Sequence, residues 1–192
     1  MSSRHLTSAL LVAALLSTAP LAASAQSAQM ISLQFSGLGM YPFGGEMDNI
    51  DVGGGWEAQI RLNPSAFSIG GGIENTFHKR LTGQDMVFLG GFLEPRYVLD
   101  IGSDNAVLYV SGRAALSQVK IKTANNEATS TGYTLNGGGG LLFRLSDRVN
   151  LDAGATLGYK DLGDVTLGAF QVDLGTGANV VARVGLAVGL GS

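Results

Sequence analysis

Apolar side chains alternate with polar or small ones along most of this chain. Trp56 and Ile60, for example, share one parity. Glu57 and Arg61 share the other. Successive side chains of a β-strand point to opposite faces, so such a segment is predicted to be a strand with one apolar face. Eight segments have this pattern: Met30–Pro42, Ile50–Leu62, Ala66–His78, Met86–Leu99, Ala106–Lys122, Tyr133–Leu145, Val149–Lys160 and Val172–Leu190.

The connections between these segments alternate in length. Bacterial membrane barrels have short periplasmic turns and longer external loops, so this spacing predicts an up-and-down barrel with both termini periplasmic. The short turns are Asn63–Ser65, Ile101–Asn105 and Ser146–Arg148, and the longer connections are Lys79–Asp85, Thr123–Gly132 and Asp161–Gln171. The first external connection, near Phe43–Asn49, is expected to be rather short.

Composition indicates which solvent surrounds the barrel. Charged residues make up 14% of the chain, against about 25% in a typical soluble protein. Glycine accounts for 29 of 192 residues, about twice its usual share. No segment after the N-terminal region reaches the ~18 consecutive apolar residues of a spanning helix. Since only helices and closed barrels pair every backbone group in lipid, we expect an all-β, eight-stranded antiparallel transmembrane barrel.

A secreted soluble barrel, apolar inside and polar outside, is the alternative with the same alternation. The polar parity here consists mainly of Gly, Ser, Asn and Thr. Such residues suit a narrow lumen better than a soluble surface. Aromatic side chains on the apolar parity lie near segment ends, as the girdles at the two lipid interfaces require. They are Tyr41, Phe67, Phe77, Tyr97, Tyr133, Phe143 and Tyr159.

The N-terminal region has the three parts of a secretory signal peptide. Arg4 and His5 form a basic start, residues 9–16 are apolar, and Ala23-Ser24-Ala25 provides the small residues of a cleavage site. We therefore expect a cleaved signal peptide over residues 1–25 and a barrel domain over residues 26–192. The chain has no cysteine, so it uses no disulfide despite its export.

Charged residues on the polar parity are predicted to form an Arg–carboxylate network in the lumen, because an unpaired charge in a narrow lumen costs several kcal/mol. The network is expected to fill and rigidify the barrel. A gated small-solute pore is the alternative. The predicted members are Glu57, Arg61, Glu74, Glu94, Arg96, Arg113, Arg144, Asp152 and Arg183.

Catalysis is not expected. Outside the signal peptide the chain has one histidine, His78, and Ser68 lies too far along the same segment for a nucleophile–base hydrogen bond. His78 is interpreted as a solvated interface residue, and a lipid-modifying enzyme remains an alternative. No phosphate-binding loop, zinc motif or calcium loop is present, so no cofactor or metal is expected. A net charge of −3 gives no indication of a nucleic-acid partner.

Some residues do not fit the alternation. Phe88 and Phe92 share parity with Glu94, and Val119 shares parity with Arg113. A β-bulge near Pro95 or Val119 would change the parity and explain the conflict.

The chain resembles the small eight-stranded outer-membrane barrels of the OmpX-like and OmpA-like families over most of Met30–Leu190. The resemblance lies in the strand pattern and in three runs: Gly53–Trp56, Glu94–Tyr97 and Tyr109–Arg113. It implies a Gram-negative outer-membrane protein with a structural or surface-interaction role. The implied partners are outer-membrane lipid, lipopolysaccharide and the barrel-assembly machinery, while the ligand of the external loops stays open.

Overall fold

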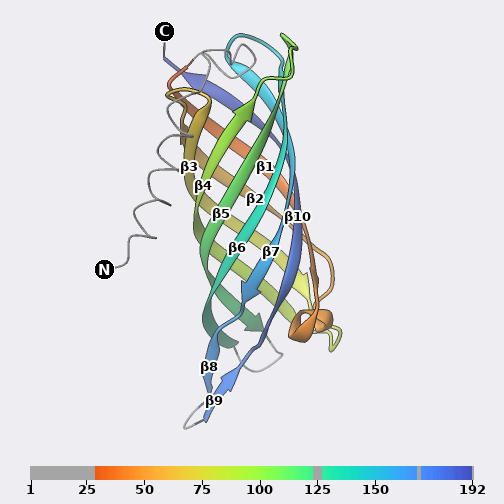
Figure 1. Cartoon of the computed structure of the whole chain (residues 1–192). Coiled ribbons are helices and arrows are strands. Elements are labelled where there is room, and N and C mark those ends of the chain that lie inside the picture. The colour runs from red at the N-terminus through yellow and green to blue at the C-terminus, as the bar shows by residue number, and fades with distance from the viewer. Residues whose placement is uncertain (1–28, 123–126, 168–169, 192) are drawn as a thin grey trace, which may run out of the picture.

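The chain forms a closed antiparallel barrel of eight strands (Figure 1). The structure is a computed structural model and describes residues 29–122, 127–167 and 170–191. The strands follow one another around the wall in sequence order, and β10 closes the barrel by pairing with β1. The wall strands are β1 (Ile31–Phe43), β2 (Gly53–Leu62), β3 (Phe67–Lys79), β4 (Asp85–Leu99), β5 (Ala106–Lys122), β6 (Glu127–Arg144), β7 (Val149–Asp161) and β10 (Thr176–Leu190).

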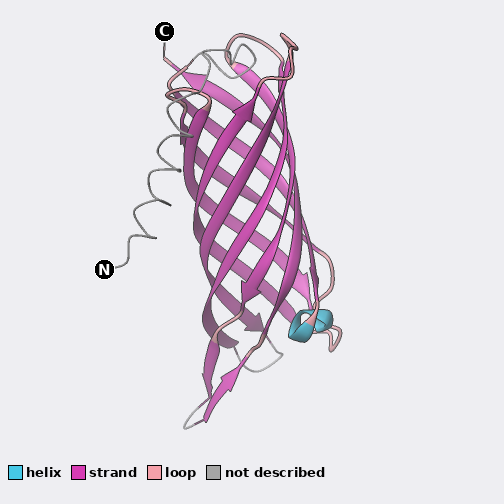
Figure 2. Ribbon diagram, in the orientation of Figure 1, coloured by secondary structure: helices cyan, strands magenta, loops and turns pink. Residues whose placement is uncertain are grey.

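The two ends of the barrel differ. At one end β1 begins and β10 ends, and short turns join β2 to β3, β4 to β5 and β6 to β7; we call it the terminal end. The opposite end is the hairpin end. It carries a 3₁₀ helix, η1 (Gly45–Asn49), and a separate hairpin of β8 (Asp164–Leu167) and β9 (Phe170–Asp173), as Figure 2 shows. The predicted signal peptide, residues 1–25, lies outside the described residues.

Three predicted boundaries are wrong at the hairpin end. β2 begins at Gly53 instead of Ile50, so the first connection is long and contains η1. β6 begins at Glu127, so the strand includes most of the predicted 123–132 loop. The predicted 161–171 loop contains β8. The eighth predicted segment begins at Val172, inside β9, whereas the eighth wall strand, β10, begins at Thr176. Residues 127–132 are mainly polar, so the pattern did not indicate the backbone pairing with β5 that extends β6.

The strand register is uniform, so no bulge lies near Pro95 or Val119. Pairing of β3 with β4 runs without a shift through Ile69↔Pro95, and that of β5 with β6 through Val119↔Ser130. The parity conflict has another cause: Phe88, Phe92 and Val119 are buried inside the lumen.

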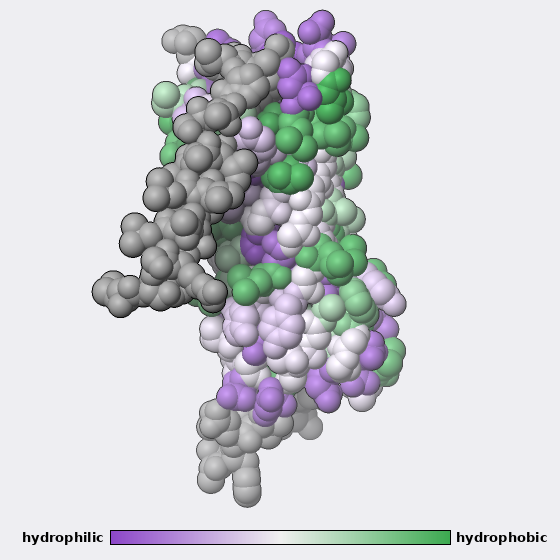
Figure 3. Space-filling view, in the orientation of Figure 1, coloured by the Kyte–Doolittle hydropathy of each residue, from purple (hydrophilic) through white to green (hydrophobic). Residues whose placement is uncertain are grey.

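Apolar side chains cover the outer wall, and most polar side chains of the strands point into the lumen. Leu93 and Leu116 are 60% and 68% exposed, whereas Glu57, Glu94 and Asp152 are fully buried. Figure 3 shows hydrophobic residues on the flank of the barrel and hydrophilic residues gathered at its two ends. No described helix is long and apolar enough to cross a membrane.

The lumen is filled in three layers. Charged and polar side chains occupy the middle, and an apolar cluster lies toward each end. The hairpin-end cluster comprises Met40, Met47, Ile50, Met86, Phe88, Val119, Ile121 and Leu162. The terminal-end cluster comprises Val98, Val107, Tyr109 and Leu142.

Candidate functional site

Six strands bring charged side chains together in the middle of the lumen. We call this group the lumen cluster, and all of its members share the inward parity of their strands. Since the register is uniform, the alternation of each strand is sufficient to aim these side chains inward. The members are Glu57 and Arg61 of β2, Glu74 of β3, Glu94 and Arg96 of β4, Arg113 of β5, Asp152 of β7 and Arg183 of β10.

Glu94 is the centre of the lumen cluster. Its carboxylate accepts hydrogen bonds from Arg183 Nη1 and Nη2, both at 2.6 Å, and from Arg96 Nε at 2.7 Å. Arg113 Nη1 lies at 3.4 Å and Arg61 Nη2 at 3.7 Å. One carboxylate therefore neutralises parts of four guanidinium groups.

Asp152 forms the second centre, toward the terminal end. Arg96 Nη1 and Gln34 Nε2 each donate to its Oδ2 atom at 2.7 Å. The Tyr109 hydroxyl donates to Oδ1 at 2.7 Å. Arg96 also stacks on the Tyr109 ring, with its guanidinium carbon 4.3 Å from the ring centroid. Tyr109 was not predicted as a member of this site, although it lies four residues from Arg113 on β5 and therefore on the same inward face.

Arg113 connects the two remaining carboxylates. Its Nη1 atom donates to Glu57 at 2.7 Å and its Nη2 atom donates to Glu74 at 2.6 Å. The guanidinium also lies over the Phe92 ring, 3.6 Å from its centroid. An aromatic face attracts a desolvated cation, which explains why Phe92 occupies a lumen position.

Arg144 does not belong to the lumen cluster. It is the last residue of β6, is only partly buried, and makes no ion pair with any described residue. Its parity is inward, but it lies two residues beyond Leu142, the cross-strand partner of Asp152, and thus nearer the terminal end than the lumen cluster. Arg144 differs from the other arginines in its position along the barrel axis. Parity predicts only the face of the strand and not this position.

Lys160 is a lumen cation that the predicted network lacked. Its ammonium group donates to Thr134 Oγ1 at 3.2 Å and lies 4.4 Å from the centroid of the Phe88 ring. Asn136 continues this polar layer by donating to Asn179 at 2.9 Å. The sequence feature that could have identified Lys160 as a lumen residue is its place on the polar face of the seventh predicted segment.

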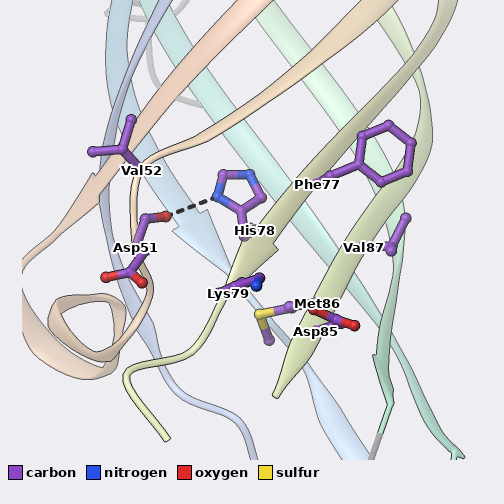
Figure 4. A pocket seen from close by; sticks show the side chains of 8 residues that line it. All are labelled: Asp51, Val52, Phe77, His78, Lys79, Asp85, Met86 and Val87. Atoms are coloured by element: carbon purple, nitrogen blue, oxygen red, sulfur yellow. Dashed lines mark hydrogen bonds between the residues drawn. The ribbon is translucent and has the colours of Figure 1, made fainter. Parts of the chain in front are cut away.

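His78 is buried, so its interpretation as a solvated residue is wrong. Its Nδ1 atom lies 3.0 Å from the Asp51 carbonyl oxygen (Figure 4), and its Nε2 atom lies 3.1 Å from Thr76 Oγ1. The ring fills the wall beside Gly53, where a Cβ atom would overlap it. A surface pocket of about 540 Å³ lies here, between the two residues that precede β2, the last residues of β3 and the first residues of β4.

Glycines provide the space that the lumen cluster occupies. A Cβ atom on Gly140 or Gly154 would overlap the Tyr109 hydroxyl, and one on Gly70 would overlap Gln59 and Arg61. The high glycine content is thus partly a packing requirement of long buried side chains.

The predicted girdle residues point outward in two groups. Tyr41, Phe77, Tyr133 and Tyr159 lie toward the hairpin end, whereas Phe67, Tyr97 and Phe143 lie toward the terminal end. Within the first group, the rings of Tyr133 and Tyr159 are 6.0 Å apart. Within the second, Phe67 and Tyr97 are direct cross-strand partners.

Metal binding has no support among the residues that the structure describes, because no group of three or more His, Cys, Asp or Glu side chains could hold an ion.

Comparison with solved structures defines the class of this fold, the small eight-stranded outer-membrane barrel. Neisserial surface protein A matches with a TM-score of 0.60 and 16% identity, over 83% of this chain and 97% of that one. The outer-membrane protein OprG from Pseudomonas aeruginosa matches with a TM-score of 0.51 and 12% identity, over 86% and 97%. No family model and no curated protein sequence matches the chain.

Proposed function

We propose that this chain is an integral protein of the Gram-negative outer membrane with a structural or surface-interaction role and a closed lumen. The observation that carries the proposal is the outer wall. Leu93, Leu116 and Leu135 are more than half exposed there, and charged side chains are buried inside. Water would penalise such a wall, whereas hydrocarbon requires it.

Strand length supports a membrane position. A tilted strand of about 9–11 residues crosses a bilayer. The shortest wall strand, β2, has 10 residues, and the others have 13 to 18. The two groups of outward aromatic side chains would lie at the two lipid interfaces.

The filled lumen favours a structural role over a solute pore. A conducting path would have to pass the hairpin-end cluster and break the ion pairs of Glu94 and Asp152. Breaking one buried ion pair by removing a partner costs about 3–5 kcal/mol. Conduction would therefore require a large rearrangement of the interior.

The proposed role involves no catalysis. Among the described residues, His78 forms a hydrogen bond with one hydroxyl group, that of Thr76, but both side chains are about 5% exposed or less. Although a surface pocket borders His78, neither side chain offers an exposed base or nucleophile to a lipid ester.

The orientation and partners follow from the same proposal. The terminal end would face the periplasm, and η1 with the β8–β9 hairpin would face outside. Outer-membrane lipid and lipopolysaccharide would surround the wall, and the barrel-assembly machinery would insert it. We expect no nucleic-acid partner.

Cell fractionation combined with inserted epitopes tests this proposal. The protein is expected in the outer-membrane fraction, with an epitope between β8 and β9 accessible to antibody on intact cells. The matched control is the same epitope in the 100–105 turn at the terminal end, which should react only after permeabilisation. Recovery in the soluble fraction, or the reverse pattern of accessibility, would contradict the proposal.

Discrete conductance of the purified barrel in planar bilayers would contradict the closed lumen.

A further inference from the structure

A shallow apolar groove of about 610 Å³ crosses the outer wall over β3, β4, β5 and β6. Small outward-facing residues leave space in it, namely Gly71, Gly91 and Ala114. Leu93 and Leu116 line the same groove and are 60% and 68% exposed. A Cβ atom on Gly91 would meet only one backbone oxygen, at 3.7 Å, so packing within the wall does not require a glycine there. The groove is therefore open to a lipid chain.

The surface pocket of about 540 Å³ lies on two of the same strands, β3 and β4, nearer the hairpin end. Phe77 and Val87 form its outward apolar part (Figure 4). Three exposed charged residues also line it, namely Asp51, Lys79 and Asp85. An ammonium group binds phosphate, and carboxylates accept hydrogen bonds from hydroxyl groups. Such a recess suits a head group that carries both phosphates and hydroxyl groups.

Positive charge on the outside of the wall is confined to one side of the barrel. Among the described side chains of the wall strands, Lys79 and Lys120 are the basic ones that face outward, and the others lie on inward faces. The two lysines lie on the strands that flank β4, one row of residues apart. Strand geometry puts their Cα atoms about 12 Å apart, a distance that two long side chains can bridge onto one head group.

We propose that this face of the barrel binds one diphosphorylated, multiply acylated saccharide lipid, the chemistry of lipopolysaccharide. Its phosphates bind Lys79 and Lys120, and an acyl chain lies in the groove below them. Phe77, an aromatic girdle residue next to Lys79, puts the lysines at the level of the head groups. A phospholipid has one phosphate and would leave one lysine without a partner. The inference rests on the proposed membrane position and deepens it, because lipid surrounds the whole wall whereas this face selects one molecule.

Native mass spectrometry of the purified barrel tests the proposal. The barrel is presented in detergent micelles with equal amounts of lipid A, which is the acylated diphosphorylated disaccharide, and phosphatidylglycerol. One bound lipid A per barrel is expected, in preference to phosphatidylglycerol. Removing both phosphates from lipid A should weaken its binding about 25-fold, because each lysine near an anionic group contributes about a fivefold preference.

Two variants separate the head group from the acyl chain. Lys79→Gln combined with Lys120→Gln should weaken lipid A binding about 25-fold and leave dephosphorylated lipid A unaffected. Ala114→Phe fills the groove without changing any charge and should weaken binding of both forms. The matched controls are Arg148→Gln in the exposed turn between β6 and β7 and Ala155→Phe on the outward face of β7, and both should bind lipid A as the unmodified barrel does.

Other results would overturn the proposal. Equal binding of lipid A and phosphatidylglycerol, or unchanged lipid A binding in the double lysine variant, would refute the site and leave the membrane position intact. Failure of the unmodified barrel to insert into lipid vesicles would contradict the membrane position and with it this site. A dimer that Ala114→Phe dissociates would assign the groove to a second copy of the chain.

Discussion

Glu94 shows how a single residue organises the interior. It has no exposed surface, and its two oxygens accept short hydrogen bonds from Arg96 and Arg183. Four guanidinium groups surround it, so its charge is needed to keep them in a low-dielectric layer. Neutralising Glu94 would leave buried cations without compensation, which is more costly than losing the hydrogen bonds alone.

Replacement of Glu94 by Gln is therefore expected to lower the free energy of unfolding by about 3–5 kcal/mol. Denaturant unfolding of the barrel in detergent or lipid would measure this change. Asp104→Asn is the matched control, because Asp104 is exposed in the turn between β4 and β5. The control should change stability by less than about 0.5 kcal/mol. Equal effects of the two substitutions would refute a central role for Glu94.

At the scale of elements, alternation in the sequence was enough to predict the eight-stranded wall, and composition together with the aromatic positions was needed to predict which face of each strand points inward. Alternation could not show that β2 begins only at Gly53, because residues 50–52 continue the pattern. Alternation also does not indicate the position of a residue along the barrel axis, so Arg144 was grouped with Arg113 and Arg183. Lumen aromatics such as Phe88 were misread as a sign of a bulge, because the expectation of a polar lumen left no place for them.

The β8–β9 hairpin is an element that the wall does not need. Among the described residues, β8 and β9 form a sheet with each other and not with the wall strands. At the base of the hairpin, the Leu162 N–H donates to the Gly175 carbonyl oxygen at 3.0 Å. Replacing residues 164–173 with an Asn-Gly turn should leave unfolding free energy and heat-dependent gel migration nearly unchanged.

Leu162, at the base of the hairpin, is the contrasting position. It is 2% exposed in the hairpin-end cluster, so Leu162→Ala should cost about 2–5 kcal/mol. Loss of folding in the hairpin deletion, with little effect of Leu162→Ala, would reverse these assignments.

At the scale of the whole molecule, the inside and the outside of the barrel are exchanged relative to a soluble protein. The wall presents Leu, Ile, Val and Phe, and the centre holds ion pairs. Stability should therefore depend on where along the barrel axis an outer charge is placed.

Leu93→Arg and Leu81→Arg test this dependence. Both leucines are exposed, at 60% and 67%, but Leu93 lies midway along β4 and Leu81 lies beyond the wall at the hairpin end. In lipid vesicles Leu93→Arg should cost about 2–4 kcal/mol, and Leu81→Arg about 0–1 kcal/mol. Unfolding titrations in vesicles measure both values. Equal, small costs would mean that water, not hydrocarbon, surrounds the wall.

The position of Arg183 has a consequence for how the barrel assembles. Arg183 lies on β10, the last strand of the chain, and its main partner Glu94 lies across the lumen on β4. The same strand forms the seam with β1. Until β10 docks, Glu94 lacks its bidentate partner and the wall has two open edges. Docking of β10 therefore closes the wall and brings Arg183 to Glu94 in the same step.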